Sequence, residues 1–157
     1  ENFDYVDKLY GFESGKEVEI NASDRNVLVK NDSDKLVQGD IIQYKTNARG
    51  EIDGITLLFD VDKKDTEAIT ELSTDLTTVY GRVTKKFAGS VNMEVDGAIH
   101  NYALPDGMTV YLYDSNRSNN NISVVSAADI EIYETGNEVR LFLKIFEDKV
   151  QEAVIVR

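Results

Sequence analysis

Residues 40–58 read DIIQYKTNARGEIDGITLL, and residues 138–156 read EVRLFLKIFEDKVQEAVIV. The two stretches align without a gap, so that Tyr44 falls on Phe142 and most other apolar positions also coincide. The polar centre of each (RGE and EDK) falls where a hairpin must turn. This repeat predicts two related β modules in tandem. Tandem β modules are typical of spacers or display units rather than of enzymes.

The composition permits a packed core and excludes several classes of partner. The chain has 157 residues, of which 41% are apolar, enough for one ordinary domain or two small ones. Its net charge of −12 makes nucleic acid and anionic lipid unexpected partners. The charge fits solubility, and it also fits binding of divalent cations or of a basic partner. Residues 1–78 carry 18 acidic against 9 basic side chains, and residues 79–157 carry 11 against 8, as two modules of different character would.

The absence of cysteine excludes disulfides, thiolate catalysis and cysteine-based zinc or iron sites. No apolar run approaches the roughly 20 residues of a membrane-spanning helix, so no membrane insertion is expected. Residues 1–15 are acidic and aromatic, unlike a signal peptide. We expect the sequence to be a fragment of a longer protein whose targeting segments lie elsewhere.

Short alternating runs separated by turn residues predict β-strands along most of the chain. Asp96-Gly97 is the strongest hairpin signal, because both central residues of a type I′ turn need positive φ. The segment 126–129 (SAAD) has capping-box spacing and predicts one short helical turn. Strands or hairpins are expected at 17–30, 41–46, 51–59, 79–87, 91–95, 98–104, 109–113, 130–133 and 138–156.

Residues 60–76 contain no glycine and no aromatic residue, and their apolar side chains fall roughly on one helical face. We therefore expect a short helical or polar linker there. The predicted fold is all-β, with two small β-barrel-like modules: a first module at 1–61, the linker at 62–76 and a second module at 77–157. The expected core of the second module consists of Val110, Leu112, Leu141, Leu143, Val154 and Val156.

Three segments resemble a known family. The run GDIIQYKT at 39–46, the run VYGRVT at 79–84 and the closing stretch 137–156 resemble recurring segments of bacterial surface proteins. The resemblance, over roughly 36–157, is to the β-rich repeat region of clostridial-type S-layer proteins that carry S-layer homology domains. It implies an extracellular protein of the cell surface and cell wall, with other surface-protein modules or cell-wall polymer as partners. The wall-anchoring S-layer homology motif itself is not recognisable in the sequence.

Candidate catalytic and metal-binding residues are few. His100 is the only histidine, and no serine lies in a G-x-S-x-G elbow, so a Ser/His/Asp relay has little basis. Clustered carboxylates are expected to be solvated acids; they are Asp32/Asp34, Asp60/Asp62/Asp65 and Glu131/Glu134. Oxygen ligands at 31–34 and 60–65 leave calcium open as a second interpretation, although neither segment is an EF-hand.

Tyr111 and Tyr113 point to the same side of one predicted strand, because side chains alternate. They would form a sugar-stacking platform, or else close a barrel end or cover an inter-module contact. We assign no catalytic, cofactor-binding or metal-binding residue and no cofactor, and the oligomeric state stays open. The expected function is a non-enzymatic structural or spacer region of an S-layer-type protein. The alternative is a carbohydrate- or ligand-binding β module, with or without calcium.

Overall fold

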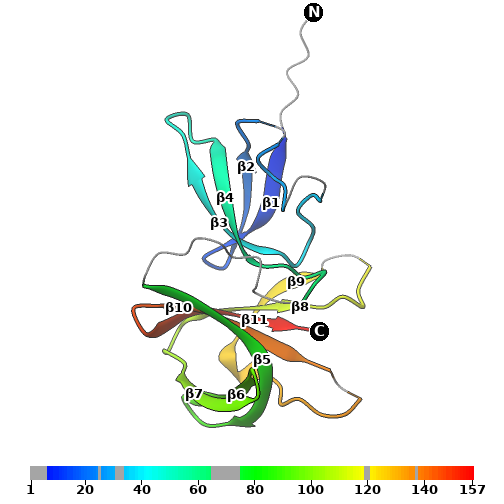
Figure 1. The fold of residues 1–157 in the computed structure, drawn as a ribbon, viewed down its shortest axis with the longest axis vertical. Coiled ribbons are helices and arrows are strands. Elements are labelled where there is room, and N and C mark those ends of the chain that lie inside the picture. Colours follow the sequence, from blue (N-terminus) through cyan, green and yellow to red (C-terminus); the bar gives the residue numbers. More distant parts are fainter. Residues whose placement is uncertain (1–6, 25, 31–33, 65–74, 119–120, 137) are drawn as a thin grey trace, which may run out of the picture. The chain divides into compact units, whose positions relative to one another are not determined.

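The computed structural model describes residues 7–24, 26–30, 34–64, 75–118, 121–136 and 138–157. The chain divides into two compact units, Glu1–Glu71 and Leu72–Arg157. Within the described residues, the regular structure comprises eleven β-strands and one 3-10 turn (Figure 1). The predicted all-β class is therefore confirmed. The division between the units falls inside the predicted linker, of which residues 65–74 lie outside the described part of the chain.

The first unit contains two antiparallel hairpins (Figure 1). Strand β1 (Lys8–Glu13) pairs with β2 (Lys16–Asn21), and β3 (Ile41–Thr46) pairs with β4 (Ile52–Phe59). A parallel bridge between Ala22 and Ile52 joins the end of β2 to the start of β4. Both bridge residues are buried, so the junction of the two hairpins is part of the unit's interior.

The hairpin predicted at 17–30 is wrong, because β2 pairs backward with β1 and not forward with 27–30. Ser14 and Gly15 have φ angles of 51° and 82°, and this left-handed pair closes the β1–β2 turn. The segment after β2 contributes only an antiparallel bridge between Val29 and Lys35. The aromatic lead-in before residue 16 therefore supplies a full strand.

The second unit contains one seven-stranded sheet with the order β7-β6-β5-β10-β11-β8-β9. Its strands are β5 (Leu76–Lys86), β6 (Ser90–Val95), β7 (Ala98–Ala103), β8 (Thr109–Tyr113), β9 (Ile122–Val125), β10 (Arg140–Phe146) and β11 (Lys149–Val156). All neighbours are antiparallel except β8 and β11, which are parallel. The parallel pair places the C-terminal hairpin at the centre of the sheet.

Strand β5 changes partners at Gly81. Its first half pairs with β10 and its second half with β6, and the ribbon is strongly curved along its length (Figure 1). A Cβ atom on Gly81 would lie 2.2 Å from the carbonyl oxygen of Glu94. Only glycine permits this backbone approach, so Gly81 allows one strand to serve both halves of the sheet.

One face of the sheet carries the core of the second unit. Val110, Leu141 and Leu143 belong to this core as predicted, and Leu112 packs against it from a half-buried position. Val154 and Val156 are buried but are not members of this cluster, because they alternate with Ala153 and Ile155, which are. The remaining members of the core are Val83, Val91, Met93, Ile130, Val139 and Val150.

The predicted β-barrels are wrong, since each sheet formed by the described residues is open. In the second unit, β7 and β9 are the two edges, and no ladder joins them among those residues. In the first unit, the two hairpins form separate two-stranded sheets. A barrel requires its edge strands to pair, and alternation alone does not show which edges meet.

Within the linker, the described residues up to Lys64 form a turn, in which the Lys64 amide donates to the carbonyl of Asp60 at 2.8 Å.

Two local predictions around residues 122–133 have opposite outcomes. The short helical turn is confirmed as a 3-10 turn at Ala127–Asp129, and the Ser126 amide donates to the Asp129 carboxylate at 2.9 Å. The strand predicted at 130–133 is wrong, and the strand of this region is β9. Ile130 is instead a buried core residue after the turn, which explains the apolar pattern.

The two aligned stretches both fold as antiparallel hairpins with a β-bulge. Their turns overlap in the alignment, but the β3–β4 connection comprises residues 47–51 and the β10–β11 turn only Glu147 and Asp148. Along residues 42–45 the registers differ by one residue: Ile42 pairs with Leu57, whereas the aligned Arg140 pairs with Val156. An additional bulge before Ile42 then places Ile41 opposite Phe59, which restores the register of β10–β11. The repeated sequence pattern therefore specifies the same strand–turn–strand block with a one-residue slip.

Candidate functional site

The most constrained polar site is a buried cluster around Lys30 in the first unit. The Lys30 Nζ atom lies 3.0 Å from Asp40 Oδ2, 2.9 Å from Asp60 Oδ1 and 2.9 Å from Asp62 Oδ2. The side chains of Lys30, Asp40 and Asp60 are 3%, 3% and 5% exposed, whereas that of Asp62 is 69% exposed. The cluster is therefore dry on one side and open to water at Asp62.

Backbone amides hold the two buried carboxylates in place. Asp40 accepts hydrogen bonds from the Val61 amide at 3.0 Å and the Val37 amide at 2.8 Å. Asp60 Oδ1 accepts from the Asp62 amide at 3.0 Å and, more weakly, from the Lys63 amide at 3.4 Å. Residue 40 precedes β3 and residue 60 follows β4, so the hairpin itself brings the two acids together. Lys30 reaches them from the segment between β2 and β3.

The environment favours the charged forms of the cluster. Burial lowers the pKa of Lys30, but hydrogen bonds to Asp62, Asp60 and Asp40 outweigh it, so that pKa lies above its ordinary value. Burial likewise raises the pKa of Asp60, but hydrogen bonds from Lys30 and the Asp62 amide outweigh it, and the net pKa is lowered. The ground state is therefore an ammonium held by carboxylates.

The calcium interpretation at 60–65 must take account of Lys30. Its ammonium occupies the space between Asp60 and Asp62, where a bound cation would have to displace it. Within the described residues, no group of three or more acids or histidines has a geometry that could hold a metal ion. Asp32 and Asp65 lie outside the described residues, so the predicted ligands at 31–34 and at position 65 are only partly described.

The other candidate residues are not brought together. His100 is exposed on the edge strand β7, with its ring 6.3 Å from that of Tyr102, and no hydrogen bond links its side chain to a described acid or serine. Glu131 accepts a hydrogen bond from Arg157, and Glu134 is exposed. Tyr111 is 6% exposed and Tyr113 is half-buried, so the pair does not form an open stacking platform.

A second cluster, which the sequence analysis missed, combines two arginines with one tyrosine. Leu141 pairs with Gly81, so Arg140 and Arg82 follow at the next positions of β10 and β5. Their guanidinium carbons lie 5.3 Å and 5.2 Å from the centre of the Tyr133 ring. Arg82 also donates to Glu94 at 2.7 Å. The ring and the carboxylate offset the repulsion between two like charges on adjacent strands.

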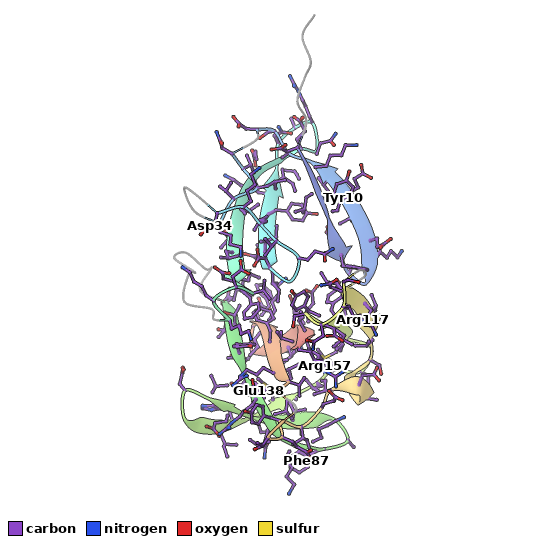
Figure 2. The ribbon with its side chains drawn as sticks, turned by 90° about the vertical axis from the view of Figure 1, so that its right-hand side faces the viewer. Tyr10, Asp34, Phe87, Arg117, Glu138 and Arg157 are labelled. Atoms are coloured by element: carbon purple, nitrogen blue, oxygen red, sulfur yellow. The ribbon has the colours of Figure 1, made fainter. Side chains whose placement is uncertain are left out.

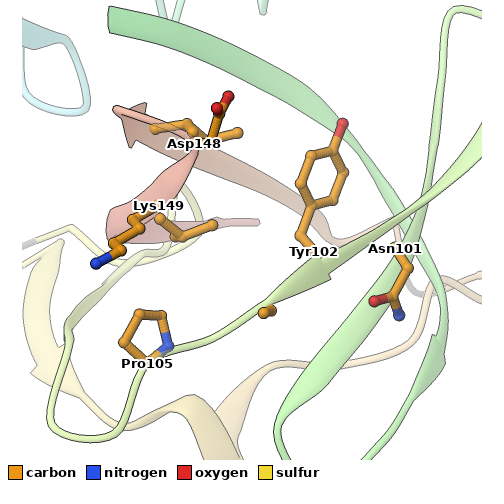
Figure 3. A pocket seen from close by; sticks show the side chains of 8 residues that line it. Asn101, Tyr102, Pro105, Asp148 and Lys149 are labelled. Carbon is orange, nitrogen blue, oxygen red and sulfur yellow. The ribbon is translucent and has the colours of Figure 1, made fainter. Parts of the chain in front are cut away.

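The pockets of the second unit are small and shallow. One, of about 150 Å³, lies between β7 and the β10–β11 turn and is bordered by Asn101, Tyr102, Pro105, Asp148 and Lys149 (Figure 3). Another, of about 180 Å³, is lined by apolar side chains together with Asp129, Glu131 and Arg157. Figure 2 shows Arg157 and, at the far end of the unit, Phe87. No serine, cysteine or histidine lines either pocket.

Sequence reasoning missed Lys30 and Asp40 as site residues. A lysine directly after the apolar run Val27-Leu28-Val29 was the available signal, because a charge carried into the interior by an apolar run needs partners. That Asp40 and Asp60 are the partners of Lys30 becomes clear only from the pairing of β3 with β4, which brings the two acids together.

The comparisons with known proteins do not assign a family. A scan against models of known protein families, a search of curated proteins and a search of solved structures each returned no match. None of the described segments forms a helix with the length and apolar character that crossing a bilayer requires. The function is therefore argued from the geometry of the two units.

Proposed function

We propose that this chain is a non-enzymatic structural or spacer region of a bacterial cell-surface protein of the S-layer type. The observation that carries the proposal is the recurrence of one bulged hairpin at aligned positions of both units. A block reused in this way supplies shape. The most constrained polar cluster of the first unit is buried, and in it Asp40 and Asp60 bind Lys30. The cluster therefore links segments of the same chain to one another.

The extracellular location rests on the family resemblance of residues 36–157 and on composition. A chain without cysteine and with a net charge of −12 remains soluble at the high local density of a surface layer. Other surface-protein modules or cell-wall polymer are the proposed partners.

A binding survey tests the proposal. The purified chain is applied to an array of bacterial wall polymers and plant polysaccharides, and binding is followed by concentration series. A spacer gives no saturable binding to any glycan other than the cell-wall polymer proposed as its partner. Saturable binding to another glycan class would contradict the spacer role and favour a binding module.

A carbohydrate- or ligand-binding module is the second candidate, favoured by the pocket beside Tyr102. Its volume of about 150 Å³ is below the roughly 300–1,000 Å³ of most ligand sites, so it would hold only one small group of a ligand, and Asp148 and Lys149 place polar groups beside Tyr102 (Figure 3). For this candidate, Tyr102→Ala abolishes saturable glycan binding. Tyr10→Ala is the matched control, because Tyr10 is an exposed aromatic on β1, outside the pocket. A melting curve with and without chelator tests calcium assistance.

A further inference from the structure

The Lys30 cluster places a primary amine in contact with two buried carboxyl groups. Lys30 Nζ lies 2.9 Å from Asp60 Oδ1 and 3.0 Å from Asp40 Oδ2, and all three side chains are at most 5% exposed. Fixed contact of this kind replaces an encounter between separate reactants and gives a large effective concentration. The buried part of the cluster thus contains the amine of Lys30, the carboxyl carbon of Asp60 and a second acid, Asp40.

We propose that Lys30 and Asp60 condense to form an intramolecular amide bond between Nζ and Cγ, with Asp40 relaying protons. The bond would tie the segment before β3 to the end of β4. This inference concerns a self-modification of the chain and does not depend on the surface location proposed above.

The hydrogen bonds distinguish the roles of the two acids. The donors to Asp60 converge on Oδ1: the Lys30 ammonium, the Asp62 amide at 3.0 Å and the Lys63 amide at 3.4 Å. The two amides are placed to stabilise negative charge on Oδ1 when Nζ attacks Cγ, so Oδ2 is the oxygen that leaves. Asp40 is held on both oxygens, by the Val61 and Val37 amides, which suits a fixed relay.

The reaction is a dehydration of the ion pair and needs no oxidant or cofactor. Asp40 passes one proton from the Lys30 ammonium to Oδ2 of Asp60, and the neutral Nζ attacks Cγ of the resulting carboxylic acid. The C–N bond forms as the C–Oδ2 bond breaks, and two protons from Nζ leave with Oδ2 as water. Asp40 ends in its starting ionised form. Because the ion pair is the stable ground state, the condensation is expected to be slow, and the exposed Asp62 side gives the water an exit.

The closed loop would contain the whole β3–β4 hairpin, since residue 30 precedes β3 and residue 60 follows β4. As with a disulfide, a tie of this span restricts the unfolded chain and so favours the folded one. A chain without cysteine would thereby gain a covalent staple by another chemistry.

Intact mass measurement of the full chain under denaturing conditions tests the proposal. Protein kept folded at neutral pH for several days is expected to weigh one water less than its sequence. Peptide mapping should then show a branched peptide joining Lys30 to Asp60. The full sequence mass in the aged protein overturns the proposal, and a branch to Asp40 overturns the assignment of roles.

Variants separate this bond from other losses of water. Lys30→Arg keeps the cation and Asp40→Asn keeps the shape of the relay, and both should retain the full mass. Lys8→Arg is the matched control, because Lys8 pairs with Glu19 at 2.8 Å, close to the 2.9 Å between Lys30 and Asp60, but on the surface. The Lys8→Arg protein should lose water as the parent does. Succinimides at Asp-Gly pairs also lose water, but they persist in Lys30→Arg and are hydrolysed at mild alkaline pH. Water loss that persists in Lys30→Arg contradicts the proposal.

Discussion

Gly81 and Glu94 approach each other so closely that the place of a Cβ on Gly81 lies 2.2 Å from the Glu94 carbonyl oxygen. The contact sits where β5 leaves β10 and begins to pair with β6. It therefore connects the two halves of the seven-stranded sheet.

Replacing Gly81 with alanine should destabilise the second unit by about 1–3 kcal/mol, because backbone must move to admit the methyl group. Denaturant unfolding measures the loss. Gly89→Ala is the matched control: it lies in the β5–β6 turn with open space around its Cβ position and should leave stability within about 0.5 kcal/mol. Equal effects of the two substitutions would contradict the close approach.

Leu143 tests the assignment of the sheet's core face. Leu143→Asp places a charge at a fully buried position of β10 and should unfold the second unit or cost more than about 3 kcal/mol. Val124→Asp introduces the same charge on the edge strand β9, where the side chain is 47% exposed, and should be nearly neutral. Circular dichroism during thermal unfolding distinguishes the two. An unchanged melting temperature for Leu143→Asp would mean that β10 is assigned wrongly.

Lys30→Met should destabilise the first unit by about 3 kcal/mol, because it leaves two buried carboxylates without their cation. This loss of stability is at the low end for a broken buried ion pair, because Asp62 keeps one side of the cluster open to water. Amide hydrogen exchange in β3 and β4 reports the loss. Adding Asp40→Asn and Asp60→Asn to Lys30→Met should restore part of it, since neutral amides cost less to bury.

Lys8→Met provides the surface comparison for that prediction. Both Lys8 and its partner Glu19 are exposed, so water screens the pair and Lys8→Met should change stability far less than Lys30→Met. A larger cost for Lys8→Met than for Lys30→Met would contradict the burial of the cluster.

Tyr44 should titrate at unusually high pH. Its hydroxyl donates to Glu13, and this hydrogen bond, followed by burial, raises the pKa of Tyr44 from 10.0 to about 12. Since the folded-state pKa is the higher one, the stabilisation is complete below pH 10 and is lost as the pH rises through about 12. Ultraviolet titration of the parent and of Tyr44→Phe should differ by one tyrosine that ionises late. If the tyrosine that distinguishes the two proteins instead titrates at the ordinary pKa, the hydrogen bond between Tyr44 on β3 and Glu13 on β1 is contradicted.

The sequence predicts local features of this fold well and pairings between distant segments poorly. Asp96-Gly97 is a positive-φ turn, at 50° and 81°, because only the two residues themselves decide it. Glu147 and Asp148 adopt the same conformation, at 50° and 64°, without a glycine, and only the aligned hairpin pattern reveals it. The partner of β2 and the openness of the sheets depend on edges that meet through the tertiary fold.

The Lys30 site shows the same limit. Position 60 was expected to be a solvated acid, since nothing adjacent in sequence neutralises it. The structure buries it by bringing Lys30 across the β3–β4 hairpin, a contact between positions thirty residues apart. The one-residue slip between the two hairpins was also beyond the sequence, because it arises from a longer connection in β3–β4, residues 47–51, where β10–β11 turns on Glu147 and Asp148 alone.

If one strand–turn–strand block builds both units, nuclear magnetic resonance should detect the cross-strand contacts of both hairpins. Contacts are expected between Tyr44 and Ile55 in the first unit and between Phe142 and Val154 in the second. Contacts that instead pair β3 or β10 with other segments, or that place only one stretch in a hairpin, would contradict this shared block.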